Sequence, residues 1–285
     1  MNSEIRLSKK IQSFLILTRP LNCLIVFFTV IVSGIICSSQ VFVFRIMIYP
    51  ALSAAFTAAA GNVINDFYDF ESDKINHPKR PLANYILVKR EALIFYFILI
   101  VTAVALSFLI NLVCICIVIF TNIILFLYSY KLKHIMLFGN FIVSFLTGMV
   151  FIFGGYAVNN VSYAVIPALF AFLINLIREV VKDMHDLEGD TKIGVKTFPF
   201  VFGYNKTKNF VLALTFILIL SSFIPVFNHF YNNQYLLVIS ILVNPLLLFT
   251  AWSIYRNHSK ENLNKLSFLL KLNMIIGLTA IYLGK

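Results

Sequence analysis

Nine long apolar runs constrain the fold of this 285-residue chain more than any other feature. A helix that crosses the hydrocarbon core of a bilayer needs about 20 consecutive, mostly apolar residues. Such runs occur at about residues 20–38, 46–65, 91–110, 112–130, 137–157, 161–181, 209–228, 235–254 and 267–284. Only 12% of the residues are charged, about half the fraction in a soluble domain. The sequence therefore predicts an all-α integral membrane protein with nine transmembrane helices.

The placement of basic residues predicts how these helices are oriented. With nine spans, the N-terminus and alternate loops share one side, and that side carries all but two of the 23 Lys and Arg residues, the exceptions being Arg45 and Lys285. Loops rich in Lys and Arg stay in the cytoplasm. We therefore expect a multi-pass protein of the cell membrane with its N-terminus cytoplasmic and its C-terminus outside. Topology and attraction to anionic membrane lipids then explain the net charge of +11, and no nucleic-acid partner is required.

Two stretches with matching aspartate spacing follow the second and sixth apolar runs. They read "GNVINDFYDFESD" (61–73) and "REVVKDMHDLEGD" (178–190), and each has three aspartates spaced by three and then four residues. The aspartates are Asp66, Asp69 and Asp73 in the first stretch and Asp183, Asp186 and Asp190 in the second. On a helix this spacing puts three side chains on one face. A single domain over residues 1–285, with an internal repeat whose motifs lie at 62–73 and 179–190, explains the match.

Six carboxylates at the membrane boundary need a cation to offset their repulsion. A charge at membrane depth is costly and usually marks function, and the negative end of a helix dipole adds to the cost. Hard oxygen ligands favour Mg²⁺, which is commonly held by a few carboxylates, waters and substrate phosphates. We therefore expect the six aspartates to be metal ligands on the cytoplasmic side, where two facing clusters hold a diphosphate through Mg²⁺.

The motifs "NDFYDFESD" (65–73) and "KDMHDLEGD" (182–190) resemble the two aspartate-rich motifs of the UbiA superfamily of intramembrane prenyltransferases. The resemblance covers nearly the whole chain, including the count of nine spans. It implies a helical bundle around a central chamber, with cytoplasmic cap loops that carry the motifs. It also implies Mg²⁺-dependent transfer of a prenyl group from a prenyl diphosphate donor to an acceptor.

Within the superfamily, these motifs and "YSYKLK" (128–133) are most similar to the members that build archaeal ether lipids. That similarity implies transfer of a geranylgeranyl group from geranylgeranyl diphosphate to a lipid phosphate acceptor, the free hydroxyl of geranylgeranylglyceryl phosphate, in phospholipid biosynthesis. A UbiA-type enzyme with an aromatic or tetrapyrrole acceptor is the first alternative. A membrane transporter or divalent-cation channel is the second, because repeated halves and intramembrane acids also occur there.

The roles of individual residues follow from these motifs. Asp66, Asp69, Asp183 and Asp186 are expected to be catalytic through their metal ions, while Asp73 and Asp190 ligate directly or through water. The substrate-binding candidates are polar residues near the clusters, namely Asn62, Arg80, Tyr128, Lys131, Lys133, Arg178, Lys182 and Arg19.

Most of these candidates are cations that could neutralise the leaving diphosphate. Tyr128 could stabilise an allylic cation with its ring. Arg19 could reach the acceptor phosphate, although anchoring at the membrane surface explains it as well, and the same alternative holds for Lys131 and Lys133. Arg178 lies about one helical turn deeper than Asp183, so we expect this intramembrane arginine to bind an anion.

Overall fold

The computed structural model describes residues 2–38, 44–76, 78–193 and 196–285. Every regular element in these ranges is a helix. Nine of the helical segments found there are long and apolar enough to cross a membrane. The prediction of an all-α chain with nine membrane helices is therefore confirmed.

The chain divides into two compact units, and each is described by itself. The first comprises Met1–Gly34, Ser38–Leu132 and Phe153–Asn160, and the second comprises Ile35–Cys37, Lys133–Ile152 and Val161–Lys285. The first aspartate cluster belongs to the first unit, and the second cluster belongs to the second unit.

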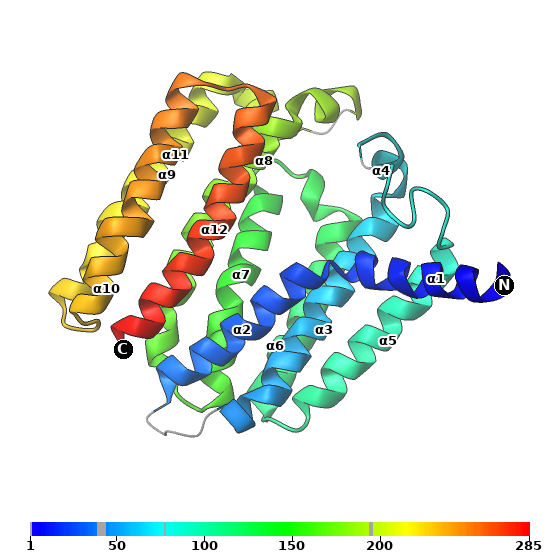
Figure 1. The fold of residues 1–285 in the computed structure, drawn as a ribbon, viewed down its shortest axis with the longest axis horizontal. Coiled ribbons are helices and arrows are strands. Elements are labelled where there is room, and N and C mark those ends of the chain that lie inside the picture. The colour runs from blue at the N-terminus through cyan, green and yellow to red at the C-terminus, as the bar shows by residue number, and fades with distance from the viewer. Residues whose placement is uncertain (1, 39–43, 77, 194–195) are drawn as a thin grey trace. The chain divides into compact units, whose positions relative to one another are not determined.

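The first unit contains the N-terminal helices. They are α1 (Asn2–Thr18), most of α2 (Pro20–Cys37), α3 (Phe44–Tyr68), the short α4 (Phe70–Asn76), α5 (Lys89–Ser107) and α6 (Leu112–Tyr130). Helix α3 packs against α1, α5 and α6 (Figure 1). Gly61 permits the approach to α6, because a Cβ there would lie 2.9 Å from a side-chain methyl of Leu125. Small residues allow membrane helices to pack this closely.

Asn111 separates α5 from α6 within an otherwise apolar stretch. Its side-chain oxygen accepts a hydrogen bond from the Cys114 backbone N–H at 2.9 Å, and its amide nitrogen donates to the Tyr156 carbonyl at 2.9 Å. An Asn at this position satisfies one of the free N–H groups at a helix start. The predicted boundary between the spans at 91–110 and 112–130 therefore has a physical cause.

Helix α1 was not among the predicted elements. Figure 1 shows that it runs at a steep angle to α5. Leu17 is fully buried, whereas Ile11 and Leu15 are more than half exposed. Phe14 packs edge-on against Phe95 with ring centroids 5.0 Å apart. The helix is too short and too polar to appear as a 20-residue apolar run, and its exposed apolar side is typical of a helix that lies in the membrane interface.

Helix α4 and the loop at 78–88 form a cap beside α3 and α5. Leu82 and Leu87 are each 1% exposed and belong to the same apolar core as Val63 of α3 and Tyr96 of α5. Burying a leucine contributes about 1.5–3 kcal/mol relative to exposing it to water. These two leucines therefore fix the loop, and with it Arg80, against the end of α3.

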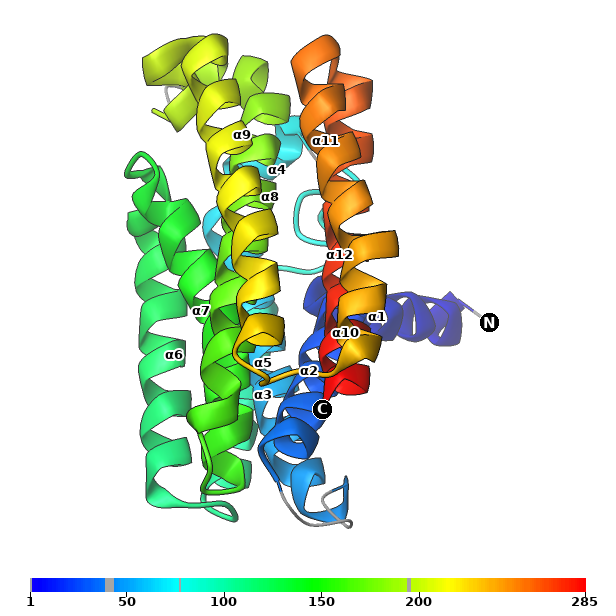
Figure 2. The same cartoon turned by 90° about the vertical axis from the view of Figure 1, so that its left-hand side faces the viewer.

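The second unit contains the remaining helices. They are most of α7 (Phe138–Ala157), α8 (Val165–Ile193), α9 (Phe198–Phe227), α10 (Asn233–Val238), a π-helical segment (Ile239–Val243), α11 (Asn244–Arg256) and α12 (Lys260–Gly284). Helix α8 packs against α9 and α12, and α11 also packs against both (Figure 2). Gly148 permits the approach of α7 to α8, because a Cβ there would lie 2.7 Å from the Ala168 carbonyl oxygen.

Several helices are longer than the apolar runs that predicted them. The runs at 161–181, 209–228 and 267–284 correspond to spans at Ser162–Leu187, Phe198–Phe227 and Lys260–Gly284. A helix can continue beyond the hydrocarbon because its backbone hydrogen bonds are internal, whereas hydropathy detects only the part in contact with lipid. Gly203 interrupts the long α9 with a left-handed φ of 76°, a conformation that glycine adopts at little cost.

Candidate functional site

Asp66 is the most buried carboxylate of the first cluster. It lies near the end of α3 and is 3% exposed. Its Oδ1 accepts hydrogen bonds from Arg19 Nη2 at 2.5 Å and from Arg80 Nη1 at 3.2 Å. The same Nη1 of Arg80 donates to Asp73 Oδ2 at 2.6 Å. One guanidinium therefore links the first and third aspartates of the motif, and a second guanidinium completes the charge balance of Asp66.

The motif keeps its helical register although α3 ends at Tyr68. The Asp69 N–H donates to the Asn65 carbonyl at 2.9 Å, and the Asp73 N–H donates to the Asp69 carbonyl at 2.7 Å. These are the i to i−4 bonds of an α-helix. They keep Asp66 and Asp73 on one side, in agreement with the predicted spacing, and Asp69 Oδ2 accepts from Asn65 Nδ2 at 2.8 Å.

Arg19 reaches Asp66 from a constrained elbow between α1 and α2. Its φ is 54°, a left-handed conformation that is uncommon outside glycine and that often marks functional sites. The Thr18 carbonyl accepts hydrogen bonds from Asn62 Nδ2 at 2.8 Å and from Cys23 Sγ at 3.1 Å. The amide nitrogen of Asn62, which was predicted to contact the substrate, therefore holds the elbow that directs Arg19 onto Asp66.

Asp73 shows why the cluster needs cations. Burial raises the pKa of Asp73 above its ordinary value, and the neighbouring Arg80 opposes that rise. A buried carboxylate is costly to ionise unless a positive charge lies nearby. Arg19 and Arg80 supply that positive charge to Asp66 and Asp73.

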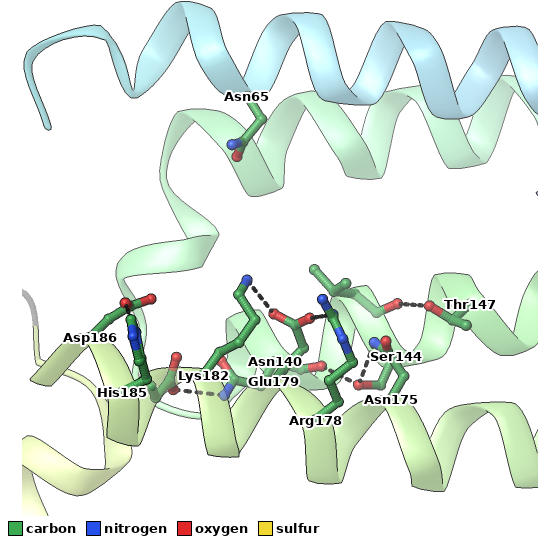
Figure 3. Close-up of polar contacts among 12 residues, drawn as sticks. Asn65, Asn140, Ser144, Thr147, Asn175, Arg178, Glu179, Lys182, His185 and Asp186 are labelled. Atoms are coloured by element: carbon green, nitrogen blue, oxygen red, sulfur yellow. Dashed lines mark hydrogen bonds and ion pairs between the residues drawn. The ribbon is translucent and has the colours of Figure 1, made fainter. Parts of the chain in front are cut away.

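The second cluster lies on α8, where Figure 3 labels Asp186 beside His185. Asp183 Oδ2 accepts a hydrogen bond from Asn140 Nδ2 of α7 at 2.7 Å. Asp186 Oδ1 lies 2.6 Å from the His185 Nδ1 atom. The side chain of Asp190 lies outside the part of the chain that the structure describes. One donor to Asp183 is thus a neutral side-chain amide.

A triad of charged side chains follows one turn deeper on α8. Glu179 Oε1 accepts from Arg178 Nη1 at 2.6 Å, and its Oε2 accepts from Lys182 Nζ at 3.3 Å. Glu179 is 14% exposed. The Nε atom of Arg178 is buried and has no hydrogen-bond partner among the residues that the structure describes. Figure 3 shows the three side chains on the same side of α8.

The remaining candidates lie near the end of α6. Lys131 is exposed at the C-cap of that helix, Lys133 is half-buried in the short turn Leu132–His134, and Tyr128 is half-buried in the last turns of α6. Their substrate roles stay predictions. Two other rings of this helix pack on Tyr68 of the first motif, namely Phe126 and Tyr130, with centroids 5.9 Å and 5.5 Å from that of Tyr68.

The donor atoms of both clusters suit a magnesium ion that is held partly by substrate. No three His, Cys, Asp or Glu side chains group together as a metal site among the residues that the structure describes. Mg²⁺ usually binds through one or two carboxylates together with waters and phosphates, so it needs no such cage. Asp69 beside Asn65, and Asp183 beside Asn140, offer hard oxygen atoms of the preferred kind. The residues present therefore fit Mg²⁺.

Three residues of the site were not among the predicted ones. Asn65 contacts Asp69, Asn140 contacts Asp183, and Glu179 joins Arg178 to Lys182. Asn65 and Glu179 are polar residues inside the two quoted motifs, and Asn140 is a polar residue in the first turn of an apolar run. In each case the signal was a polar side chain at membrane depth.

The described part of the chain has nine helices long and apolar enough to span a membrane. Clusters of acidic residues lie at the ends of two of them, and the first cluster forms ion pairs with arginines. These features define a multi-pass membrane protein with charged sites at the ends of its spans. The model of the UbiA prenyltransferase family matches residues 26–275. The chain belongs to this family and is a prenyltransferase.

Comparisons with individual proteins agree over nearly the full length. A digeranylgeranylglyceryl phosphate synthase from Methanosphaera stadtmanae is 33% identical over 93% of this chain and 96% of its own. A solved structure of a digeranylgeranylglyceryl phosphate synthase has a TM-score of 0.77 and 34% identity, covering 97% of this chain and 98% of its own. A UbiA homologue from Archaeoglobus fulgidus bound to DMAPP and Mg²⁺ has a TM-score of 0.67, covers 94% of this chain and 99% of its own, and at 20% identity supports the fold alone. Family membership favours the enzyme over the transporter or channel.

Proposed function

We propose that this protein transfers a geranylgeranyl group from geranylgeranyl diphosphate to the free hydroxyl of geranylgeranylglyceryl phosphate. The observation that carries the proposal is the pair of matched carboxylate clusters at the ends of two apolar helices. They occur in a chain that is similar to digeranylgeranylglyceryl phosphate synthases along more than nine-tenths of its length. The reaction is a step of membrane-lipid synthesis.

Both clusters serve the donor diphosphate in this proposal. Asp66, Asp69 and Asp73, with Asp183, Asp186 and Asp190, would hold Mg²⁺, and the hard carboxylate oxygens of both motifs support this assignment. The bound metal would spread the negative charge of the leaving group. Arg19 and Arg80 form ion pairs with buried carboxylates. When those carboxylates bind metal, the two arginines would pair with the diphosphate instead.

The chemistry is a substitution at C1 of the prenyl chain. The bond between C1 and the diphosphate oxygen breaks, and its electron pair leaves with the diphosphate. The acceptor hydroxyl oxygen forms the new bond to C1, and its proton passes to the released diphosphate. Positive charge develops on the allylic carbons meanwhile, and an aromatic face stabilises such charge. Tyr68, Phe126 and Tyr130 form an aromatic cluster beside the first motif, and Tyr128 lies near it in the sequence.

The proposal also includes the side of the membrane that the active site faces. All 12 acidic residues and nearly all basic residues lie on the side predicted to be cytoplasmic. The active site would face the cytoplasm, where water-soluble diphosphate can leave, while both prenyl chains remain in the bilayer among membrane lipids.

An acceptor assay tests the function directly. Purified protein with geranylgeranyl diphosphate, Mg²⁺ and radiolabelled geranylgeranylglyceryl phosphate should form a product with two prenyl chains. A hydroxybenzoate acceptor is assayed in parallel. Transfer to the aromatic ring alone would replace the lipid acceptor with an aromatic one, and transfer to neither acceptor would refute the proposal.

A further inference from the structure

The triad on α8 carries more positive charge than its own contacts neutralise. Arg178 and Lys182 share the single carboxylate of Glu179, so the group has a net charge of one positive unit inside or near an apolar span. Within the described part of the chain, the buried Nε of Arg178 has no hydrogen-bond partner. A buried donor without a partner and an uncompensated charge both cost free energy. An anionic ligand would remove both costs.

The first motif lacks an equivalent of this triad. When Asp66 is matched to Asp183, Gly61 takes the place of Arg178 and Asn62 takes the place of Glu179. Gly61 packs closely against Leu125, and Asn62 binds the Thr18 carbonyl. The aspartates are therefore common to both motifs, whereas the deep cations belong to the second motif alone. Their ligand is expected to differ from the diphosphate that both motifs would bind.

We infer that Arg178 and Lys182, held in place by Glu179, bind the phosphate of the lipid acceptor. This inference deepens the proposed function and rests on it. A helix rises about 1.5 Å per residue, so Arg178 lies roughly 7–8 Å deeper along α8 than Asp183. A diphosphate held at the level of the aspartates directs its apolar chain, and therefore its C1 atom, toward the bilayer interior.

The direction of attack explains why the acceptor phosphate would lie at this depth. The hydroxyl must approach C1 from the side opposite the leaving diphosphate, which is the deeper side. In geranylgeranylglyceryl phosphate the free hydroxyl and the phosphate are on neighbouring carbons, so the phosphate lies close to the attacking oxygen. Arg178, about one turn below the metal ligands, would meet this second anion together with Lys182, which is joined to it through Glu179, whereas the cations of the first cluster would meet the first anion.

The geometry of the triad suits a phosphate. Glu179 contacts Arg178 through Nη1, which leaves the edge of the guanidinium formed by Nε and Nη2. That edge matches two phosphate oxygens in a bidentate contact. The Lys182 side chain is 44% exposed and the Arg178 side chain is 23% exposed, although the Nε atom of Arg178 is itself buried. Glu179 acts as a positioning residue that fixes two long, flexible side chains.

The test compares two acceptors that differ only in the phosphate. Wild type and Arg178→Gln are assayed with geranylgeranylglyceryl phosphate and with the same lipid after removal of the phosphate. Losing a charged contact to phosphate should raise the KM for the phosphorylated acceptor by about tenfold or more. The preference for the phosphorylated acceptor should fall by a similar factor, while the KM for geranylgeranyl diphosphate changes by less than about twofold.

Two further variants keep the test decisive. Arg256→Gln is the matched control, because Arg256 is an exposed arginine of the same unit that stacks over Trp252, and it should leave both KM values unchanged. Lys182→Met probes the same phosphate through the more exposed cation and should reduce the preference even if Arg178→Gln does not accumulate.

Two results would overturn the inference. The first is an unchanged preference between the two acceptors in both variants. The second is an increase in the KM for geranylgeranyl diphosphate in place of the KM for the acceptor, which would assign the triad to the donor. A wild-type protein that fails to use the glyceryl phosphate at all would instead refute the proposed function, so the two failures are distinguishable.

Discussion

The first aspartates of the two clusters have different hydrogen-bond donors. Asp66 is almost fully buried and accepts from two arginines, whereas Asp183 accepts from the neutral amide of Asn140. Charge-assisted hydrogen bonds are stronger than neutral ones and neutralise the carboxylate. The first cluster therefore carries cations that could pass to a diphosphate.

The metal role is tested best at Asp69 and Asp186. Asp66 and Asp73 also hold Arg19 and Arg80, so changing them would combine loss of a metal ligand with loss of the cap. Asp69→Asn and Asp186→Asn keep the size of the side chain and remove its charge. Each should lower kcat/KM by about 100-fold or more, because the leaving group loses electrostatic stabilisation.

The measurement is prenyl transfer as a function of Mg²⁺ concentration. Both variants should also require more Mg²⁺ for half-maximal activity, and EDTA should stop the wild-type reaction until Mg²⁺ is restored. Glu261→Gln, which removes an exposed carboxylate at the start of α12, is the control and should behave like wild type. Full turnover by either aspartate variant, or an unaffected reaction in EDTA, would contradict the metal role.

At the scale of the elements, Asn111 gives the clearest case of a polar residue that sets a helix boundary. It caps α6 and also donates to the Tyr156 carbonyl. Asn111→Ala removes both hydrogen bonds and should cost about 1–2 kcal/mol of stability. We expect a lower melting temperature in detergent with unchanged specific activity at low temperature. Asn233→Ala, at the exposed start of α10, is the control. An unshifted melting temperature for Asn111→Ala would show that the cap contributes nothing.

Hydropathy predicted the membrane helices well because each span must cover its backbone with apolar side chains. It gave all nine spans, since the length of a span is fixed by the thickness of the bilayer. It missed α1, which is too short and too polar to form an apolar run, and it placed the start of α9 about a dozen residues too late. Interfacial segments carry both polar and apolar residues, so their composition does not distinguish a helix from a loop.

The site was predictable as a set of charges and unpredictable as a set of contacts. The aspartate spacing indicated a shared face, and Arg80 does reach both Asp66 and Asp73. Nothing in the sequence indicated that Asn62 binds the elbow at Thr18 or that Asn140 contacts Asp183. Those contacts join residues about 44 positions apart, and they depend on how helices pack.

At the scale of the whole molecule, the two units use corresponding elements to contact their first aspartates. In the first unit Arg19 stands directly before α2 and contacts Asp66 at the end of α3. In the second unit Asn140 lies in the first turn of α7 and contacts Asp183 of α8. Each first aspartate is thus contacted from the start of the preceding membrane helix. This correspondence supports the internal repeat predicted from the motifs at 62–73 and 179–190.

If both clusters serve one diphosphate, residues beside them must come within crosslinking distance. Glu71 lies inside the first motif with its side chain 76% exposed, and Thr191 is exposed directly after the second motif. In a variant whose four native cysteines are replaced, Glu71→Cys with Thr191→Cys should crosslink with a short bifunctional thiol reagent. Mg²⁺ and inorganic pyrophosphate should raise the yield, because the shared ligand draws both sets of carboxylates to it.

The matched control pairs Glu71→Cys with Asn233→Cys, since Asn233 is predicted to lie on the other side of the membrane and should give no crosslink. Prenyl transfer by the cysteine-free parent establishes that the background is functional. An active parent whose Glu71 and Thr191 cysteines fail to crosslink with any reagent length, with or without pyrophosphate, would mean that the two motifs do not share a substrate. The carboxylates of α8 would then need a role separate from that of the donor diphosphate.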